Sequence, residues 1–298
     1  MWGGLFVSWI ALQCTPAPKK RRFTVVATTS MIGDTLQQVV KDKAQVITLM
    51  GPGVDPHAYK ATQQDVQALT QADLVFYNGL HLEGKMADML GKLAKKKAVY
   101  AAGQALQPSQ HIADPNFPTG VDPHIWFDLR IWQQVVRYIC SCVQSKDPQN
   151  KDYYQHNADE YLKKLEALDN YVRASIAKVP LRQRVLITAH DAFSYFGRAY
   201  DIEVRGLQGI STVSECGLRD VTELVNFIVS RNIKAIFLET SVPERPLRAV
   251  VEGCKKRGHA VSIGGYLYSD ALGESGTDSA SYEGMVRANT NTIVEALR

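Results

Sequence analysis

The chain has 298 residues, of which 45% are hydrophobic and 21% are charged, and its formal net charge is +4. This length suggests two domains of roughly 100–200 residues each, and the composition is typical of a soluble globular protein. The modest charge argues against a nucleic-acid-binding protein. We interpret the one basic cluster near the N-terminus as a solvated linker; it consists of Lys19, Lys20, Arg21 and Arg22.

Residues 1–22 have the pattern of an export leader followed by a linker. The apolar run 5–12 is far too short to span a bilayer as a mature helix. Cys14 and a polar, proline-containing stretch follow directly, which resembles a bacterial lipoprotein signal. No Lys or Arg precedes the apolar run, so a plain secretory signal stays open. We expect an exported chain, either periplasmic or anchored through a lipid at Cys14 to the outer face of the cytoplasmic membrane.

Short runs rich in Val, Ile and Phe alternate with helical patterns along the rest of the chain, which predicts βαβ units and parallel sheets. The strands predicted in the first half are residues 23–28, 45–50, 74–77 and 98–101. Those in the second half are 184–189, 203–206, 235–239 and 260–263, with a turn expected at Gly264 and Gly265. We therefore predict an α/β fold of two lobes, each with a small parallel β-sheet flanked by helices.

Residues 150–178 have the periodicity of one long helix. No Gly or Pro interrupts this segment before Pro180, and its apolar side chains recur at three- and four-residue steps: Tyr154, Ala158, Tyr161, Leu165, Leu168, Val172 and Ile176. At about 1.5 Å per residue such a helix is roughly 40 Å long. We predict that 148–179 links an N-terminal lobe, 23–147, to a C-terminal lobe, 180–298. A single stiff link favours small lobe rotations over wide hinge opening.

The pentapeptide GVDPH occurs twice and contains His57 and His124. Asp favours the N-cap of a helix and Pro its first turn, so each copy is interpreted as a helix start that fixes an imidazole. His190 ends a predicted strand, and Asp270 follows the last one. Ligands of open α/β sheets bind beyond the carboxyl ends of strands, so these four side chains should converge on one cleft. Three imidazoles and a carboxylate suit Zn²⁺, Mn²⁺ or Fe²⁺ better than Mg²⁺ or Ca²⁺.

Six motifs resemble, in order and spacing, the TroA-like solute-binding proteins of zinc and manganese ABC importers: GPGVDPHAYKAT, YNGLHLE, DPHIWFD, LITAHDAFSYF, GLQGIST and GGYLYSDALG. The resemblance runs from about Phe23 to the C-terminus. It implies two α/β lobes joined by one long backbone helix, with one metal ion between them bound by His57, His124, His190 and Asp270. It also implies that a monomeric chain delivers the metal to the membrane subunit of an ABC permease.

Two departures from relatives bear on which metal is bound. The zinc-specialised branch often carries a long loop rich in His and acidic residues. Residues 107–121 of this chain contain a single histidine, His111, and no such run. The manganese branch commonly has Glu where this chain has His190, and the additional nitrogen raises zinc affinity. Zn²⁺ outbinds Mn²⁺ at most such sites. We therefore expect a site for both zinc and manganese, with Fe²⁺ left open.

Two acidic residues are candidates for a hydrogen bond that fixes the tautomer of a ligand imidazole. They are Glu239, which ends the strand 235–239, and Asp191, next to His190. Trp126 and Phe127 are expected to pack against the cleft wall. Three of the remaining histidines are interpreted as surface or structural residues, namely His111, His156 and His259, whereas His81 belongs to the motif NGLHLE but not to the ligand set that the resemblance implies.

Two other functions stay open at this point. A metallohydrolase is one alternative, because three His and a carboxylate can also bind catalytic zinc, although the chain contains no HExxH motif. A surface adhesin is the other. A dinucleotide site is excluded, because GxGxxG does not follow the first predicted strand.

Overall fold

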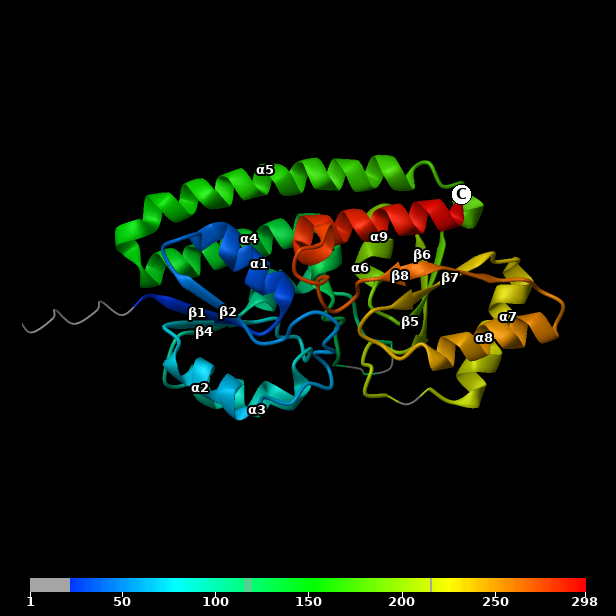
Figure 1. Cartoon of the computed structure of the whole chain (residues 1–298), viewed down its shortest axis with the longest axis horizontal. Helices are drawn as coiled ribbons and strands as arrows, with labels where there is room; N and C mark the ends of the chain where they lie inside the picture. Colours follow the sequence, from blue (N-terminus) through cyan, green and yellow to red (C-terminus); the bar gives the residue numbers. More distant parts are fainter. Residues whose placement is uncertain (1–21, 116, 118, 215) are drawn as a thin grey trace, which may run out of the picture.

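A computed structural model of the chain describes residues 22–298 with the exception of 116, 118 and 215. The expected leader and Cys14 therefore lie outside the described residues. Two α/β lobes lie side by side, and one long helix, α5 (Lys151–Ile176), runs along both (Figure 1). The predicted fold class is confirmed. Among the described residues, no helix combines the length and the apolar character that crossing a membrane would require.

The N-terminal lobe contains a parallel sheet with the strand order β2-β1-β3-β4. Its strands match the predicted ones within two residues: β1 (Thr24–Ala27), β2 (Gln45–Thr48), β3 (Leu74–Tyr77) and β4 (Val99–Ala101). Alternate side chains point to opposite faces. Val25 and Phe76 join the core under α1 (Ser30–Val40) and α4 (Leu129–Lys146). Val26 and Val75 pack with α2 (Gln63–Gln71) and α3 (Ala87–Ala94).

The C-terminal lobe contains two parallel strand pairs, β5 (Val185–His190) with β6 (Glu203–Gln208), and β7 (Ala235–Glu239) with β8 (Ser262–Leu267). Strands β5 and β7 lie beside each other. One face packs on α7 (Leu218–Arg231) and α8 (Arg245–Lys256), and the other packs on α9 (Tyr282–Leu297). The remaining α-helix is α6 (Ser194–Tyr200). Short 3-10 segments are Gly84–Met86, Ala102–Ala105, Pro108–Gln110, Ile125–Phe127, Pro148–Asn150, Leu181–Gln183 and Asp278–Ala280.

Strand β8 differs from the prediction. The expected strand 260–263 and the turn after it are wrong, because the strand continues through both glycines to Leu267, with an irregular register opposite Ile236 and Phe237. Gly265 has φ +139°, and a Cβ on Gly264 would lie 2.6 Å from the Cβ of Ala296 in α9. The glycines thus mark a bulge under a closely packed helix instead of a chain reversal.

Helix α5 buries the apolar stripe that the sequence predicted: Tyr154, Ala158, Tyr161, Leu165, Leu168, Val172 and Ile176. It packs on α4 and α1 of the N-terminal lobe and on α9. Each described cysteine is a free thiol; these are Cys140, Cys142, Cys216 and Cys254.

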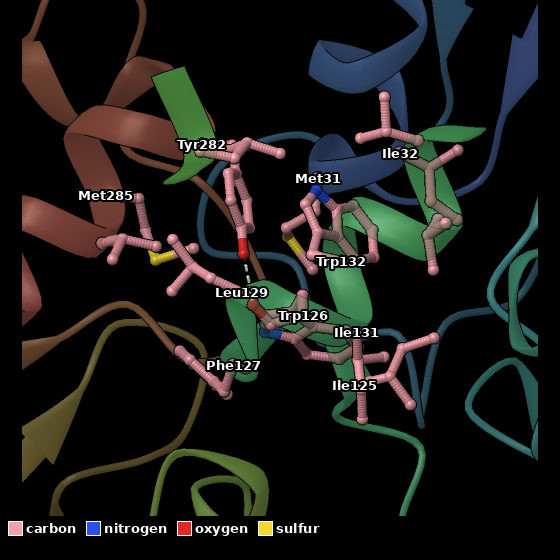
Figure 2. Close-up of a cluster of buried hydrophobic side chains, with 14 of the residues drawn as sticks. Met31, Ile32, Ile125, Trp126, Phe127, Leu129, Ile131, Trp132, Tyr282 and Met285 are labelled. Carbon is pink, nitrogen blue, oxygen red and sulfur yellow. Dashed lines mark hydrogen bonds between the residues drawn. The ribbon is translucent and has the colours of Figure 1, made fainter. Parts of the chain in front are cut away.

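Helix α9 is a second element that contacts both lobes, which the sequence did not indicate. Its body packs on β8, whereas its first residue, Tyr282, lies in the core of the N-terminal lobe. The Tyr282 ring stacks on Trp132 with centroids 5.3 Å apart and an interplanar angle of 21°. Its hydroxyl donates to the carbonyl of Trp126 (Figure 2). The lobes therefore share a continuous apolar core, which supports small relative movements.

Candidate metal centre

The two GVDPH segments form the same turn. The Asp55 carboxylate accepts a hydrogen bond from the backbone N–H of His57 at 2.9 Å, and Asp122 accepts one from His124 at 2.8 Å. The predicted helix starts are wrong: the first copy is an isolated turn, and the second leads into a 3-10 segment, Ile125–Phe127. Each Asp bonds the N–H two residues ahead, which closes a turn and not a helix. The backbone of each histidine is nevertheless fixed.

The carboxylates of the two copies have different second partners. Asp122 Oδ1 lies 2.7 Å from His124 Nδ1. A carboxylate at this distance keeps the proton on Nδ1 and leaves the Nε2 lone pair free for a metal. Asp55 instead accepts a hydrogen bond from Thr212 Oγ1 of the opposite lobe at 2.6 Å. One copy therefore orients its own imidazole, and the other connects the lobes.

His190 is oriented by Glu239 because β5 and β7 are neighbours that both end at the site. The backbone N–H of His190 donates to Glu239 Oε1 at 2.8 Å, and His190 Nδ1 lies 2.6 Å from Glu239 Oε2. Asp191 behaves differently, since its carboxylate accepts a hydrogen bond from Ser194 at 2.8 Å. Sequence reasoning missed the orienting role of Asp122. Its signal was the position two residues before the histidine, which was interpreted only as a helix cap.

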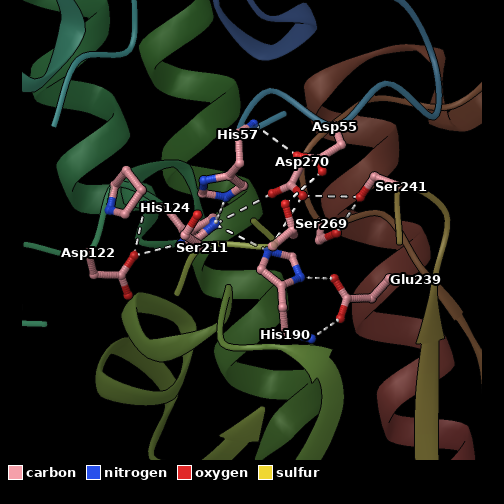
Figure 3. A network of polar contacts seen from close by, with 12 residues as sticks. Asp55, His57, Asp122, His124, His190, Ser211, Glu239, Ser241, Ser269 and Asp270 are labelled. Atoms are coloured by element: carbon pink, nitrogen blue, oxygen red, sulfur yellow. Dashed lines mark hydrogen bonds and ion pairs between the residues drawn. The ribbon is translucent and has the colours of Figure 1, made fainter. Parts of the chain in front are cut away.

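The four side chains proposed from the sequence come together between the lobes (Figure 3). Each offers one donor atom, and these atoms lie within 4.8 Å of one another. His124 Nε2 is 3.3 Å from His57 Nε2 and 3.4 Å from His190 Nε2. Asp270 oxygens lie 3.5 Å and 3.4 Å from Nε2 of His124 and His190. Zn–N bonds of about 2.0–2.1 Å give a tetrahedron with edges of about 3.3 Å, so these four spacings are close to tetrahedral edges, although the group as a whole extends to 4.8 Å.

Burial makes the electrostatics of the group strong, because the four side chains are at most 4% exposed. Burial alone lowers the pKa of His124, but Asp122 and Asp270 outweigh it and raise that pKa to about 9. His190 follows the same pattern, with Glu239 and Asp270 holding its pKa well above the usual value. Burial would raise the pKa of Asp270, yet His190 and His124 keep it well below its ordinary range.

His57 differs from the other two histidines. Burial lowers its pKa to about 3, and the neighbouring His124 and His190 act in the same direction. Its imidazole is therefore neutral at physiological pH and can bind a metal without losing a proton.

Trp126 packs against the site as expected, and Phe127 packs behind it against Trp126. The Trp126 ring lies beside the ring of His124 with centroids 5.2 Å apart, and its Nε1 donates to the carbonyl of Ser269 at 2.9 Å. Phe127 stacks on Phe193 at 4.3 Å. Trp126 therefore covers one side of His124 with an apolar ring, whereas Asp122 and Glu239 make polar contacts with the other ring nitrogens of His124 and His190.

The other histidines lie outside this group. His81 is exposed on a left-handed turn, and His156 is exposed on α5. His259 donates to the carbonyl of Ile233 at 2.7 Å. His111 is partly buried in the loop before the second GVDPH.

Comparisons with known proteins agree with this geometry. The family profile described as "Zinc-uptake complex component A periplasmic" (ZnuA) matches residues 25–296. The manganese-binding lipoprotein MntA of Bacillus subtilis is 48% identical over 278 residues, covering 93% of this chain and 90% of that protein. The zinc-binding protein TroA of Treponema pallidum is 43% identical over 275 residues, covering 92% and 88%.

Similarity extends to solved structures. The periplasmic zinc-binding protein TroA from Treponema pallidum superposes with a TM-score of 0.91 at 42% identity, covering 93% of this chain and 99% of that one. Fe(III)-bound YtgA from Chlamydia trachomatis gives a TM-score of 0.84 at 27% identity, covering 92% and 98%. The chain therefore belongs to the ZnuA family, the metal-binding solute-binding proteins of ABC importers, which are not enzymes.

Proposed function

We propose that this chain captures one divalent transition-metal ion outside the cytoplasmic membrane and delivers it to the membrane subunit of an ABC permease. The ligands in this proposal are His57 and His124 from the N-terminal lobe, 23–147, and His190 and Asp270 from the C-terminal lobe, 180–298, with 148–179 as the link. One observation carries the proposal: three imidazole nitrogens and a carboxylate, all buried, converge from the two lobes within 4.8 Å.

Zinc and manganese are the proposed cargo. Relatives of similar sequence are named for manganese in one case and for zinc in another. A donor set of three nitrogens and one oxygen accepts both, and Zn²⁺ binds more tightly than Mn²⁺ in the Irving–Williams order, so metal supply decides which is carried. Fe²⁺ remains a third candidate.

The proposed location outside the cytoplasmic membrane rests on relatives that are named lipoproteins or periplasmic proteins. We propose that the leader and linker segment 1–22 directs export of the chain and that a lipid at Cys14 anchors the chain to the membrane. We also propose that the chain acts as a monomer. A hydrolase has no support, because the family is not enzymatic and Asp270 supplies a fourth donor where catalytic zinc would bind water. No observation favours an adhesin.

Native mass spectrometry combined with elemental analysis tests the proposal. Protein stripped with a chelator and then exposed to Zn²⁺ or Mn²⁺ is expected to bind one ion per chain with either metal, because the donors form one group. The stripped protein is the control. If none of the first-row divalent metals binds, the proposed function is wrong.

Metal affinity is expected to rise with pH. The pKa of His124 is about 9, so the metal-free protein carries a proton there at pH 7, and an imidazole must lose this proton to bind a metal. Each proton displaced makes the affinity change by about tenfold per pH unit between pH 6 and 8, and His190, whose pKa is also held well above the usual value, adds to this slope. Calorimetric titration in buffers of different ionisation enthalpy should report at least one proton released per ion at pH 7.5. A release near zero would contradict the prediction.

A further inference from the structure

The two carboxylate oxygens of Asp270 have different surroundings. Oδ2 accepts a hydrogen bond from Ser241 Oγ at 3.1 Å, whereas Oδ1 has no hydrogen-bond partner among the described residues. Both oxygens face imidazole nitrogens: Oδ1 lies 3.5 Å from His124 Nε2, and Oδ2 lies 3.4 Å from His190 Nε2. Asp270 could therefore bind a metal through Oδ1 alone or through both oxygens. Ser241 contacts Oδ2, the oxygen that binds the metal only in the second case (Figure 3).

Ser241 is held in place by its neighbours. It follows β7, where the backbone N–H of Thr240 continues the ladder to the carbonyl of Leu267 at 3.0 Å. Its hydroxyl lies 2.9 Å from the hydroxyl of Ser269, which is fully buried and whose carbonyl is bound by Trp126. When Ser241 donates its proton to Asp270, Ser269 can donate to Ser241. The two hydroxyls then form a chain that ends on Oδ2.

We propose that Ser241 is a specificity-determining residue that restricts Asp270 to binding the metal through Oδ1 alone. This inference rests on the proposed function. A hydrogen bond withdraws charge from Oδ2 and occupies a lone pair, so a second metal–oxygen bond must compete with the hydroxyl. Binding through one oxygen completes a four-coordinate N3O shell, which suits Zn²⁺. Binding through both oxygens adds a fifth donor and more oxygen character, which favours Mn²⁺ relative to Zn²⁺.

The change from one-oxygen to two-oxygen binding requires little movement, because both oxygens already face the donor group. Loss of one hydrogen bond is sufficient, and the turn that carries Asp270 can stay as it is. Ser241 therefore acts on metal choice without being a ligand itself.

The variant Ser241→Ala tests this inference, with Ser241→Thr as the matched control that retains a hydroxyl. Co²⁺ is the spectroscopic probe, since four-coordinate Co²⁺ absorbs visible light several-fold more strongly than five- or six-coordinate Co²⁺. Ser241→Ala is expected to weaken the Co²⁺ band and to raise the ratio of Mn²⁺ affinity to Zn²⁺ affinity by about tenfold, the lower range for residues behind metal ligands. Ser241→Thr should restore both values toward those of the parent.

The outcomes separate this inference from the function on which it rests. If the parent protein binds Zn²⁺ and Co²⁺ but Ser241→Ala has the same band and the same affinity ratio, the role of Ser241 is wrong while the proposed function stands. Equal weakening of Zn²⁺ and Mn²⁺ with an unchanged band indicates a structural role and also overturns the inference. If the parent binds no metal, the proposed function itself fails. Ser241→Gly, which also removes the hydroxyl and introduces no metal-binding atom, replaces the Ala variant if that variant does not fold.

Discussion

Replacing His57 with Ala is expected to lower the affinity for Zn²⁺ and Mn²⁺ by more than about 100-fold, because losing a ligand exceeds the 10–100-fold cost of losing a residue behind one. The imidazole of His57 is neutral in the metal-free protein, since its pKa is about 3, so it can bind a metal without first losing a proton. The chain should remain folded. The hydrogen bond that closes the turn uses the backbone N–H of His57 and the carboxylate of Asp55, and both survive the substitution.

A competition titration against a chromophoric chelator measures this loss for each metal. His156→Ala is the matched control, because His156 is exposed on α5 and lies outside the donor group. Its affinity should equal that of the parent. A His57→Ala variant that binds zinc as tightly as the parent would remove His57 from the ligand set.

The variant Glu239→Gln is expected to weaken metal binding by about 10–100-fold. The carboxylate of Glu239 contacts both the backbone N–H and Nδ1 of His190 and is buried, with 2% exposure. An amide offers one carbonyl oxygen where two oxygens are needed, and its NH₂ group would face one of these N–H donors. The imidazole then loses the contact that keeps its proton on Nδ1 and its Nε2 lone pair directed at the metal.

Asp191→Asn is the matched control for this variant. Asp191 adjoins His190 in sequence, but its carboxylate accepts its hydrogen bond from Ser194. The same chelator titration should therefore give an affinity near that of the parent. If the two variants lose affinity equally, orientation by Glu239 is not the cause, and a general loss of charge near the site explains both.

Much of the architecture could be predicted because it is encoded locally. The apolar stripe of α5 repeats at helical spacing over its whole length, and β3 and β7 are short runs of buried apolar residues whose ends the sequence located. Strand ends in parallel sheets share one edge, so the side chains of His190 and Glu239 could be expected near the cleft. The four proposed ligands were brought together as expected, and their role in binding metal stays a prediction.

Contacts between segments distant in sequence could not be predicted. The bulge in β8 arises because α9 packs too closely for a side chain at Gly264, and the local sequence resembles a turn. The two GVDPH copies have the same letters, yet Asp122 faces its own imidazole and Asp55 faces Thr212. Ser241 contacts Asp270 only because β7 and the turn after β8 lie side by side in the assembled fold. In each case the deciding partner is more than 25 residues away or the choice between partners depends on the assembled fold.

The position of Tyr282 has a consequence for how the protein is made. Tyr282 stacks on Trp132 inside the lobe that begins near residue 23, so that lobe lacks part of its core until nearly the whole chain has been synthesised. Closing such a long loop is slow, because its entropy must be lost before the contact forms. We infer that the ribosome releases a chain whose first lobe is still incompletely folded. A first lobe that closes only when the C-terminal helix docks is compatible with export of the chain before its folding is complete.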